Sequence, residues 1–152
     1  FEAALKRKAD VIVTIDSDMQ HDPDDIPRLL KVFKEKNLDI IVGARPLDKK
    51  MPSVFKFGNW FLNKVFYLLF KEKIKDTQSG FRVFKAKVYD KIRWQSSGYS
   101  VEVEMLANAG KHKLKCEEVP IATRYVDKYK CTTVLDGIKI FFRMILWKIR
   151  GD

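Results

Sequence analysis

The chain has 152 residues, of which 46% are hydrophobic, and it carries a formal net charge of +10. This length and apolar content suit one domain with a real core and are too small for two, so we expect a single domain over residues 1–152. The positive charge indicates anionic partners, such as nucleic acid, acidic lipid or phosphorylated small molecules. No zinc-finger, RNA-recognition or helix-turn-helix pattern occurs, so no nucleic-acid partner is expected.

The sequence also bears on the cellular setting. Cys116 and Cys131 lack C-x-x-C spacing, so neither a disulfide framework nor a zinc site is supported, and reduced thiols in the cytoplasm are expected. No apolar run reaches the roughly 18–20 residues that cross a bilayer, and no signal-peptide pattern opens the chain. Residues 1–8 resemble the middle or end of a helix and carry no initiating methionine, so we expect further sequence upstream.

Two predicted strands flank a predicted helix in the first third of the chain. Residues 10–16 are a β-branched run that suits a central parallel strand. Asp22 can cap the following helix and Pro23 fits its first position, and this helix is expected to run to about Lys36. Residues 38–44 predict a second short parallel strand. The β-α-β order favours an α/β sandwich with a mostly parallel central sheet.

Two longer helices are predicted further on. Residues 54–71 have one broad apolar face, formed by positions 54, 57, 61, 65, 68 and 69, which either packs in the core or lies partly in a membrane interface. Residues 134–150 predict a basic amphipathic helix, which is either an ordinary surface helix or one that leans on anionic lipid. Its basic residues are Lys139, Arg143, Lys148 and Arg150. Between them we expect a strand at 81–84, a helix at 100–109 and a strand at 116–121.

An acidic motif follows the first predicted strand, at the edge where open α/β sheets bind their ligands. Asp16 and Asp18 lie two apart on an extended backbone, so both carboxylates can project to the same side, and Gln20 or His21 can add a third contact. Carboxylates with few other protein ligands suit Mg²⁺ or Mn²⁺, which retain water and take phosphate oxygens as ligands. The alternative is an acidic helix cap, but two acids precede the capping residue, which favours a metal site.

Two other phosphate-handling classes are disfavoured. Phosphatases of the haloacid dehalogenase type also end a strand with D-x-D, but they have Thr or Val two residues after the second Asp, where this chain has Gln20. The G-x-x-x-x-G-K-[S/T] loop that cradles phosphates in P-loop enzymes does not occur.

A set of motifs resembles one family. Residues 16–23 (DSDMQHDP) resemble the D-A-D-x-Q-H-D-P segment of inverting family-two glycosyltransferases, in the dolichol-phosphate mannose synthase-like branch that glycosylates polyprenyl phosphates. Residues 42–45 resemble the branch's V-G-S-R strand end, residues 57–59 part of its R-x-x-G-N helix start, and residues 76–82 its D-T-Q-S-G-F-R signature. The D-x-D alone is weak, whereas the ordered set is specific. The resemblance implies a GT-A-type nucleotide-sugar-binding sandwich whose first strand or strands precede Phe1.

The resemblance also implies site residues. Asp16 and Asp18, with Gln20 as a third member, would hold the Mg²⁺ or Mn²⁺ that bridges the donor diphosphate. The expected catalytic residues are Asp18, Asp76 and Arg82, and the expected substrate-binding residues are Arg45, Lys56, Asn59, Ser79 and Arg124. Lys56 stands where the branch has arginine, and lysine offers a point charge in place of a bidentate fork.

The role of Asp76 stays open at this point. It can serve as a base, as an orienter of Arg82 or of sugar hydroxyls, or as the cap of a turn around Gly80. Glu102 and Glu104 are weaker acidic candidates.

The chemistry of the acceptor favours a phosphate. A hydroxyl acceptor requires a carboxylate base. A phosphate monoester, with a second pKa of about 6, is already largely ionised at neutral pH and needs cations to position it. We therefore expect a sugar to pass from a nucleotide-sugar donor to a polyprenyl (dolichyl) phosphate, catalysed by a protein peripheral to the cytoplasmic face of a membrane and in contact with anionic lipid. The alternatives are transfer to a sugar or protein hydroxyl and a non-catalytic basic binding module.

Overall fold

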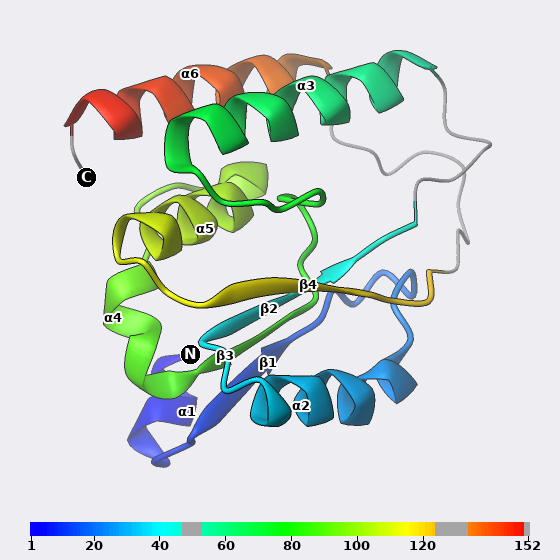
Figure 1. Ribbon diagram of the computed structural model, residues 1–152, viewed down its shortest axis with the longest axis vertical. Helices are drawn as coiled ribbons and strands as arrows, with labels where there is room; N and C mark the ends of the chain where they lie inside the picture. Colours follow the sequence, from blue (N-terminus) through cyan, green and yellow to red (C-terminus); the bar gives the residue numbers. More distant parts are fainter. Residues whose placement is uncertain (47–52, 124–133, 151–152) are drawn as a thin grey trace.

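The computed structural model describes residues 1–46, 53–123 and 134–150 (Figure 1). In chain order its elements are α1 (Glu2–Lys6), β1 (Val11–Thr14), η1 (Pro23–Asp25), α2 (Ile26–Glu35), β2 (Ile40–Ala44), α3 (Ser53–Phe70), β3 (Arg82–Lys85), η2 (Ala86–Val88), α4 (Tyr89–Ile92), η3 (Gly98–Ser100), α5 (Val101–Lys111), β4 (Cys116–Pro120) and α6 (Val134–Arg150). Every strand and long helix expected from the sequence is therefore present.

The four strands form one mixed sheet in the order β1-β3-β2-β4. Strands β2 and β4 are parallel neighbours, whereas β3 pairs antiparallel with both β1 and β2. Strands β1, β2 and β4 therefore point in one direction, as expected, and β3 lies between the two strands of the β1–α2–β2 unit. The α/β class is confirmed, with one antiparallel strand that the hydrophobic pattern did not reveal.

Helices cover both faces of the sheet. In Figure 1, α3 and α6 lie side by side as an outer layer, α5 lies between them and the sheet, and α2 covers the opposite face. One core cluster joins the helical layer to β2 and includes Phe66, Leu106 and Met144, while another lies under α2 around Leu29 and Phe33. Burial of one such side chain stabilises the fold by about 1.5–3 kcal/mol, so these two clusters fix the sheet between its helices.

Helix α2 begins as its sequence predicts. The Asp22 side chain accepts a hydrogen bond from the Asp24 N–H at 3.1 Å, which confirms the predicted cap, and Pro23 opens the 3₁₀ turn that leads into the helix. This capped start anchors the residues that follow β1.

Helix α3 does not bury the expected face. Leu62 and Phe66 enter the core, with 6% and 0% of their surface exposed, whereas Val54 and Phe57 are each 65% exposed and Leu68 is 55% exposed. The prediction of core packing is therefore wrong for these last three residues. Nearly every side of this helix carries apolar residues, so periodicity alone does not select the side that meets α6 and the sheet. No described helix is both long and apolar enough to cross a membrane.

Candidate active site

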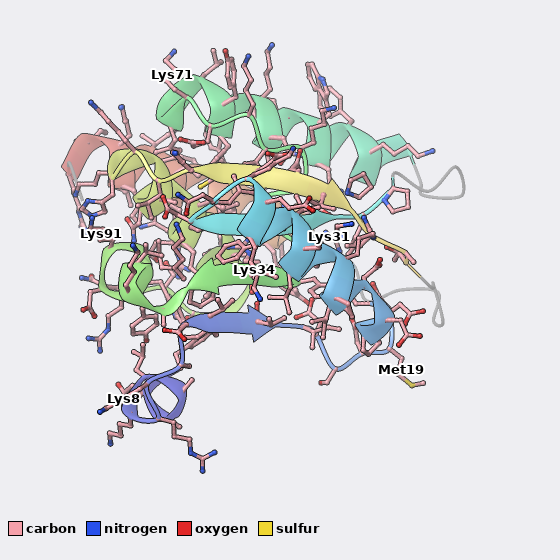
Figure 2. All side chains as sticks on the ribbon, turned by 60° about the horizontal axis from the view of Figure 1, so that its bottom comes forward. Lys8, Met19, Lys31, Lys34, Lys71 and Lys91 are labelled. Atoms are coloured by element: carbon pink, nitrogen blue, oxygen red, sulfur yellow. The ribbon has the colours of Figure 1, made fainter. Side chains whose placement is uncertain are left out.

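Three segments that are distant in the sequence meet at one edge of the sheet. Because β1 and β2 run in the same direction, Asp16 and Arg45 follow their carboxyl ends at the same edge, and β3, which is antiparallel to both, begins there. The Thr14 hydroxyl donates a hydrogen bond to the Gly80 carbonyl at 2.7 Å and ties the end of β1 to the loop before β3. In Figure 2, Met19 lies beyond the arrowhead of β1, whereas Lys8 lies at the opposite end of the molecule.

The Asp16 carboxylate packs directly on Gly80. It accepts a hydrogen bond from the Gly80 backbone N–H, and a Cβ atom at position 80 would lie 2.3 Å from Asp16 Oδ1. On its other side, the Nε2 atom of the buried His21 lies 3.4 Å from Asp16 Oδ2. The His21 hydrogen bond is the largest of the influences that hold the Asp16 pKa below its usual value. Any side chain at position 80 would therefore force the Asp16 carboxylate out of its present place.

Asp18 lies in a turn beyond the strand. Strand β1 ends at Thr14, and the backbone reverses at Met19, whose φ is +64°. The exposed Asp18 accepts a hydrogen bond from the Gln20 N–H at 3.1 Å through Oδ1. The extended geometry expected for residues 16–18 is therefore wrong, although both acidic residues stay at the same edge.

The donor set around Asp16 consists of few protein oxygens. Within the described ranges no group of three or more His, Cys, Asp or Glu residues could hold a metal ion by itself. The side chain of Asp16 is half exposed and Asp18 is exposed, so two carboxylates are open to a ligand. This set fits a hard cation such as Mg²⁺ or Mn²⁺ that takes its remaining ligands from water and phosphate oxygens, and it does not fit a closed protein cage.

Asp76 forms a bidentate ion pair with Arg45. Arg45 Nε lies 2.8 Å from Asp76 Oδ2, Arg45 Nη2 lies 2.8 Å from Oδ1, and the Arg45 backbone N–H also donates to Oδ2 at 3.1 Å. Both carboxylate oxygens therefore accept hydrogen bonds from the residue that follows β2. Of the three roles left open for Asp76, this geometry corresponds to an orienter, but of Arg45 and not of Arg82.

Arg82 and Ser79 are interior residues. Arg82 is 1% exposed and donates hydrogen bonds to the carbonyls of Ser79 at 2.9 Å, Thr77 at 3.0 Å and Glu102 at 2.7 Å. Burial lowers the pKa of Arg82 to about 10, which leaves it charged at neutral pH. Ser79 is fully buried. Both side chains are buried within the loop before β3, and the expected roles of Arg82 in catalysis and of Ser79 in substrate binding stay predictions.

The other predicted residues lie on α3, on α5 or beyond the described ranges. Lys56 and Asn59 are half-buried in the first half of α3, and Arg124 lies outside the described residues. Burial raises the pKa of Glu102, an effect that the Arg82 guanidinium partly opposes. Glu104 is buried and accepts hydrogen bonds from two backbone N–H groups, so it anchors a loop.

Asn63 and Glu118, which the sequence did not single out, hold the loop that carries Asp76 through four hydrogen bonds. Asn63 left a weak signal, a polar residue on a largely apolar helix. Glu118 left none, because its partners are 42 and 43 residues away.

This edge brings carboxylates, a fixed arginine and a hydrogen-bonded loop together, an arrangement suited to a ligand that carries phosphate groups. The chain belongs to glycosyl transferase family 2, whose model matches residues 2–93. This membership confirms the expected class of protein, and the α/β architecture is consistent with the expected GT-A type.

The chain is similar to several curated proteins, two of which carry names of the expected branch. The chain is 37% identical over 97% of its length to an uncharacterized protein of Methanocaldococcus jannaschii, and it covers 64% of that protein. It is 36% identical over 96% of its length to the UDP-N-acetylglucosamine–dolichyl-phosphate N-acetylglucosaminyltransferase of Methanococcus voltae, covering 61% of it. It is 29% identical over 91% of its length to the dolichol-phosphate mannosyltransferase of Pyrococcus furiosus, covering 42% of it. The chain thus spans less than two thirds of the length of these relatives.

Proposed function

We propose that this chain belongs to the catalytic part of an enzyme that transfers a sugar from a nucleotide-sugar donor to a polyprenyl phosphate at a membrane surface. The observation that carries the proposal is an apolar groove of about 340 Å³ between α3 and α6. The groove is lined by Phe57, Phe61, Ile138 and Phe141, and it reaches Gln78, two residues after Asp76. An isoprenoid chain in this groove would bring its phosphate toward the Asp76–Arg45 pair.

Arg45 is the residue proposed to receive the acceptor phosphate. Arginine binds phosphate oxygens through paired N–H donors, and a guanidinium that is already oriented loses less freedom when it binds. Asp76 supplies that orientation through its two oxygens. A phosphate acceptor is ionised at neutral pH, so the reaction does not need Asp76 as a base. Lys56 and Asn59 of α3, together with Arg124, are proposed as further contacts of the acceptor.

Asp16 and Asp18, with Gln20 as a third member, are proposed to hold Mg²⁺ or Mn²⁺ on the donor diphosphate. The metal, when bound, would neutralise the charge that grows on the departing nucleotide diphosphate. The Gly80 N–H and His21 hold the Asp16 carboxylate in place, and its lowered pKa keeps it ionised at neutral pH. Arg82 is proposed to act as a positioning residue, because its three hydrogen bonds fix the carbonyls of the loop between Asp76 and Gly80.

The outer face of α3 and α6 is the part proposed to contact the membrane. Large apolar side chains are exposed along both helices, among them Trp60 and Phe142 at 59% each and Ile149 at 76%. Exposed Lys64 and Lys139 lie on the same two helices. Apolar side chains that enter the headgroup region and cations that meet anionic lipid are the two contributions that hold a peripheral helix at a bilayer. These helices are therefore proposed to contact an anionic membrane surface. The cytoplasmic face is the side proposed, because its leaflet carries the anionic lipids.

The test is transfer by the intact protein. The protein is incubated with Mn²⁺, a polyprenyl phosphate in liposomes and a panel of nucleotide sugars, and lipid-linked sugar is quantified. One nucleotide sugar should give product, and Asp16→Ala should abolish it, whereas Glu117→Ala, on the surface of β4, should not. Absence of product with every donor would overturn the proposal.

A further inference from the structure

Glu118 holds the backbone beside the Arg45–Asp76 pair from another element of the fold. Its Oε1 atom accepts hydrogen bonds from the backbone N–H groups of Lys75 at 2.6 Å and Asp76 at 2.8 Å. Glu118 lies on β4, next to β2, which ends one residue before Arg45. One carboxylate oxygen thus joins the strand edge to the loop that carries Asp76.

The loop needs such anchors because it has no regular secondary structure of its own. Asn63 on α3 donates to the Lys75 carbonyl and accepts a hydrogen bond from the Thr77 hydroxyl at 2.9 Å. Glu118 supplies acceptors for N–H groups that neither a helix nor a strand satisfies at this point, and unsatisfied backbone groups are costly when they are withdrawn from water. Of these two side chains, Glu118 is the one that contacts Asp76 itself.

A continuous series of hydrogen bonds leads from Glu118 to Arg45. Glu118 fixes the Asp76 backbone, and the Asp76 carboxylate fixes the Arg45 guanidinium and its backbone N–H. We propose that Glu118 is a positioning residue for the acceptor phosphate, because it sets the orientation in which Asp76 presents Arg45. This inference rests on the proposed function and adds to it a residue that touches neither substrate.

The experiment compares variants at adjacent positions of β4. Glu118→Ala removes the acceptor of both N–H groups, whereas Glu118→Gln keeps an oxygen at the same place. Glu117→Ala is the matched control, because Glu117 forms a surface ion pair with Lys36. Initial rates are measured with varied polyprenyl phosphate and, separately, with varied nucleotide sugar.

Glu118→Ala should raise the KM for polyprenyl phosphate about 10- to 100-fold, the size expected when a binding group is displaced by about 1 Å. The KM for the nucleotide sugar should stay within about twofold, and Glu118→Gln should recover most of the acceptor affinity, since its oxygen can still accept both bonds. An unchanged acceptor KM would overturn the role. A parallel loss in both substrates, together with a lower melting temperature, would show a purely structural residue and would also overturn it.

Coupling to Arg45 gives the sharper test. If Glu118 acts through Arg45, adding Glu118→Ala to Arg45→Ala should change the acceptor KM by less than about twofold, whereas independent effects would multiply. Glu118→Asp, which moves the carboxylate by one methylene, serves the same cycle if Glu118→Ala does not fold. A wild-type protein without transferase activity would overturn the proposed function. An active wild type with multiplicative effects would overturn only the inference about Glu118.

Discussion

Substitution of Gly80 by alanine tests the packing between the two motifs. The added Cβ would lie 2.3 Å from Asp16 Oδ1 and 2.5 Å from Oδ2, against about 3.4 Å for an ordinary contact, so the carboxylate must retreat by about 1 Å. That movement breaks the hydrogen bond from the Gly80 N–H and disturbs the contact with His21. Displacement of a reacting group by about 1 Å can cost about 10²-fold in rate, so kcat/KM for the nucleotide sugar should fall about 100-fold.

The assay is the initial rate of transfer with varied nucleotide sugar at saturating acceptor, beside thermal unfolding of each variant. Gly43→Ala is the control, because its added Cβ would lie 2.9 Å from Ile121 Cγ2 and 3.2 Å from the Phe81 carbonyl oxygen and would not meet Asp16. Gly43→Ala should lower the melting temperature and leave the KM of the nucleotide sugar nearly unchanged. A Gly80→Ala protein that folds and keeps kcat/KM within about threefold of wild type would refute the proposed role of Asp16 in donor binding.

Three further outcomes are expected. Asp76→Asn should raise the KM for polyprenyl phosphate and lower kcat less than about tenfold in steady-state kinetics, whereas a kcat loss of about 10²–10⁴-fold would reveal a general base. The double change Trp60→Ser and Phe142→Ser should weaken sedimentation with anionic liposomes at least tenfold, since each aromatic ring contributes about 1.5–3 kcal/mol when fully buried, and unchanged sedimentation would contradict the membrane face. Asp39→Asn should lower the free energy of unfolding, measured in urea at pH 7. Asp39 accepts hydrogen bonds from the Lys85 side chain and from the Lys115 N–H. Burial raises the pKa of Asp39, but these two bonds outweigh it and hold the pKa below 3.8. The folded-state pKa is the lower one, so this stability is full above pH 3.8 and is lost as pH falls through the folded pKa. A difference that does not shrink as the pH falls below 3.8 would contradict the assignment.

The elements were predictable because their signals are local. The β-branched run at residues 10–16 and the Asp22-Pro23 start of the next helix are set by neighbouring residues, and both appear in the structure within a few residues of their predicted limits. The position of β3 between β1 and β2 depends on pairing between residues about 70 apart, which no local pattern reveals.

The candidate site was also predictable only in part. Asp16 and Arg45 come to one edge because β1 and β2 run in the same direction, a consequence that the β-α-β order already implies. Asp76 comes to the same edge because the antiparallel strand β3 begins there, which the sequence did not reveal. Which partner each side chain takes was not predictable. The pairing of Asp76 with Arg45 spans 31 residues, and Arg82, a charged residue, lies in the interior because three carbonyls satisfy its guanidinium.

The environment of the outer face of α3 could not be predicted from the sequence for a different reason. The sequence left core packing and membrane contact open for this helix. Val54, Phe57 and Leu68 are exposed, so they do not pack in the core. Which side of α3 is buried depends on the position of α6 beside it, and the sequence of α3 alone does not contain that information. The sedimentation experiment with Trp60 and Phe142 tests whether a membrane covers the exposed apolar side chains of α3 and α6.

One comparison decides whether the acceptor is a lipid phosphate. The intact protein is given a single active nucleotide sugar and, in matched liposomes, either a polyprenyl phosphate or the same polyprenol without its phosphate. Sugar should appear on the polyprenyl phosphate and not on the polyprenol. Equal transfer to the polyprenol, or transfer to the polyprenol alone, would contradict it.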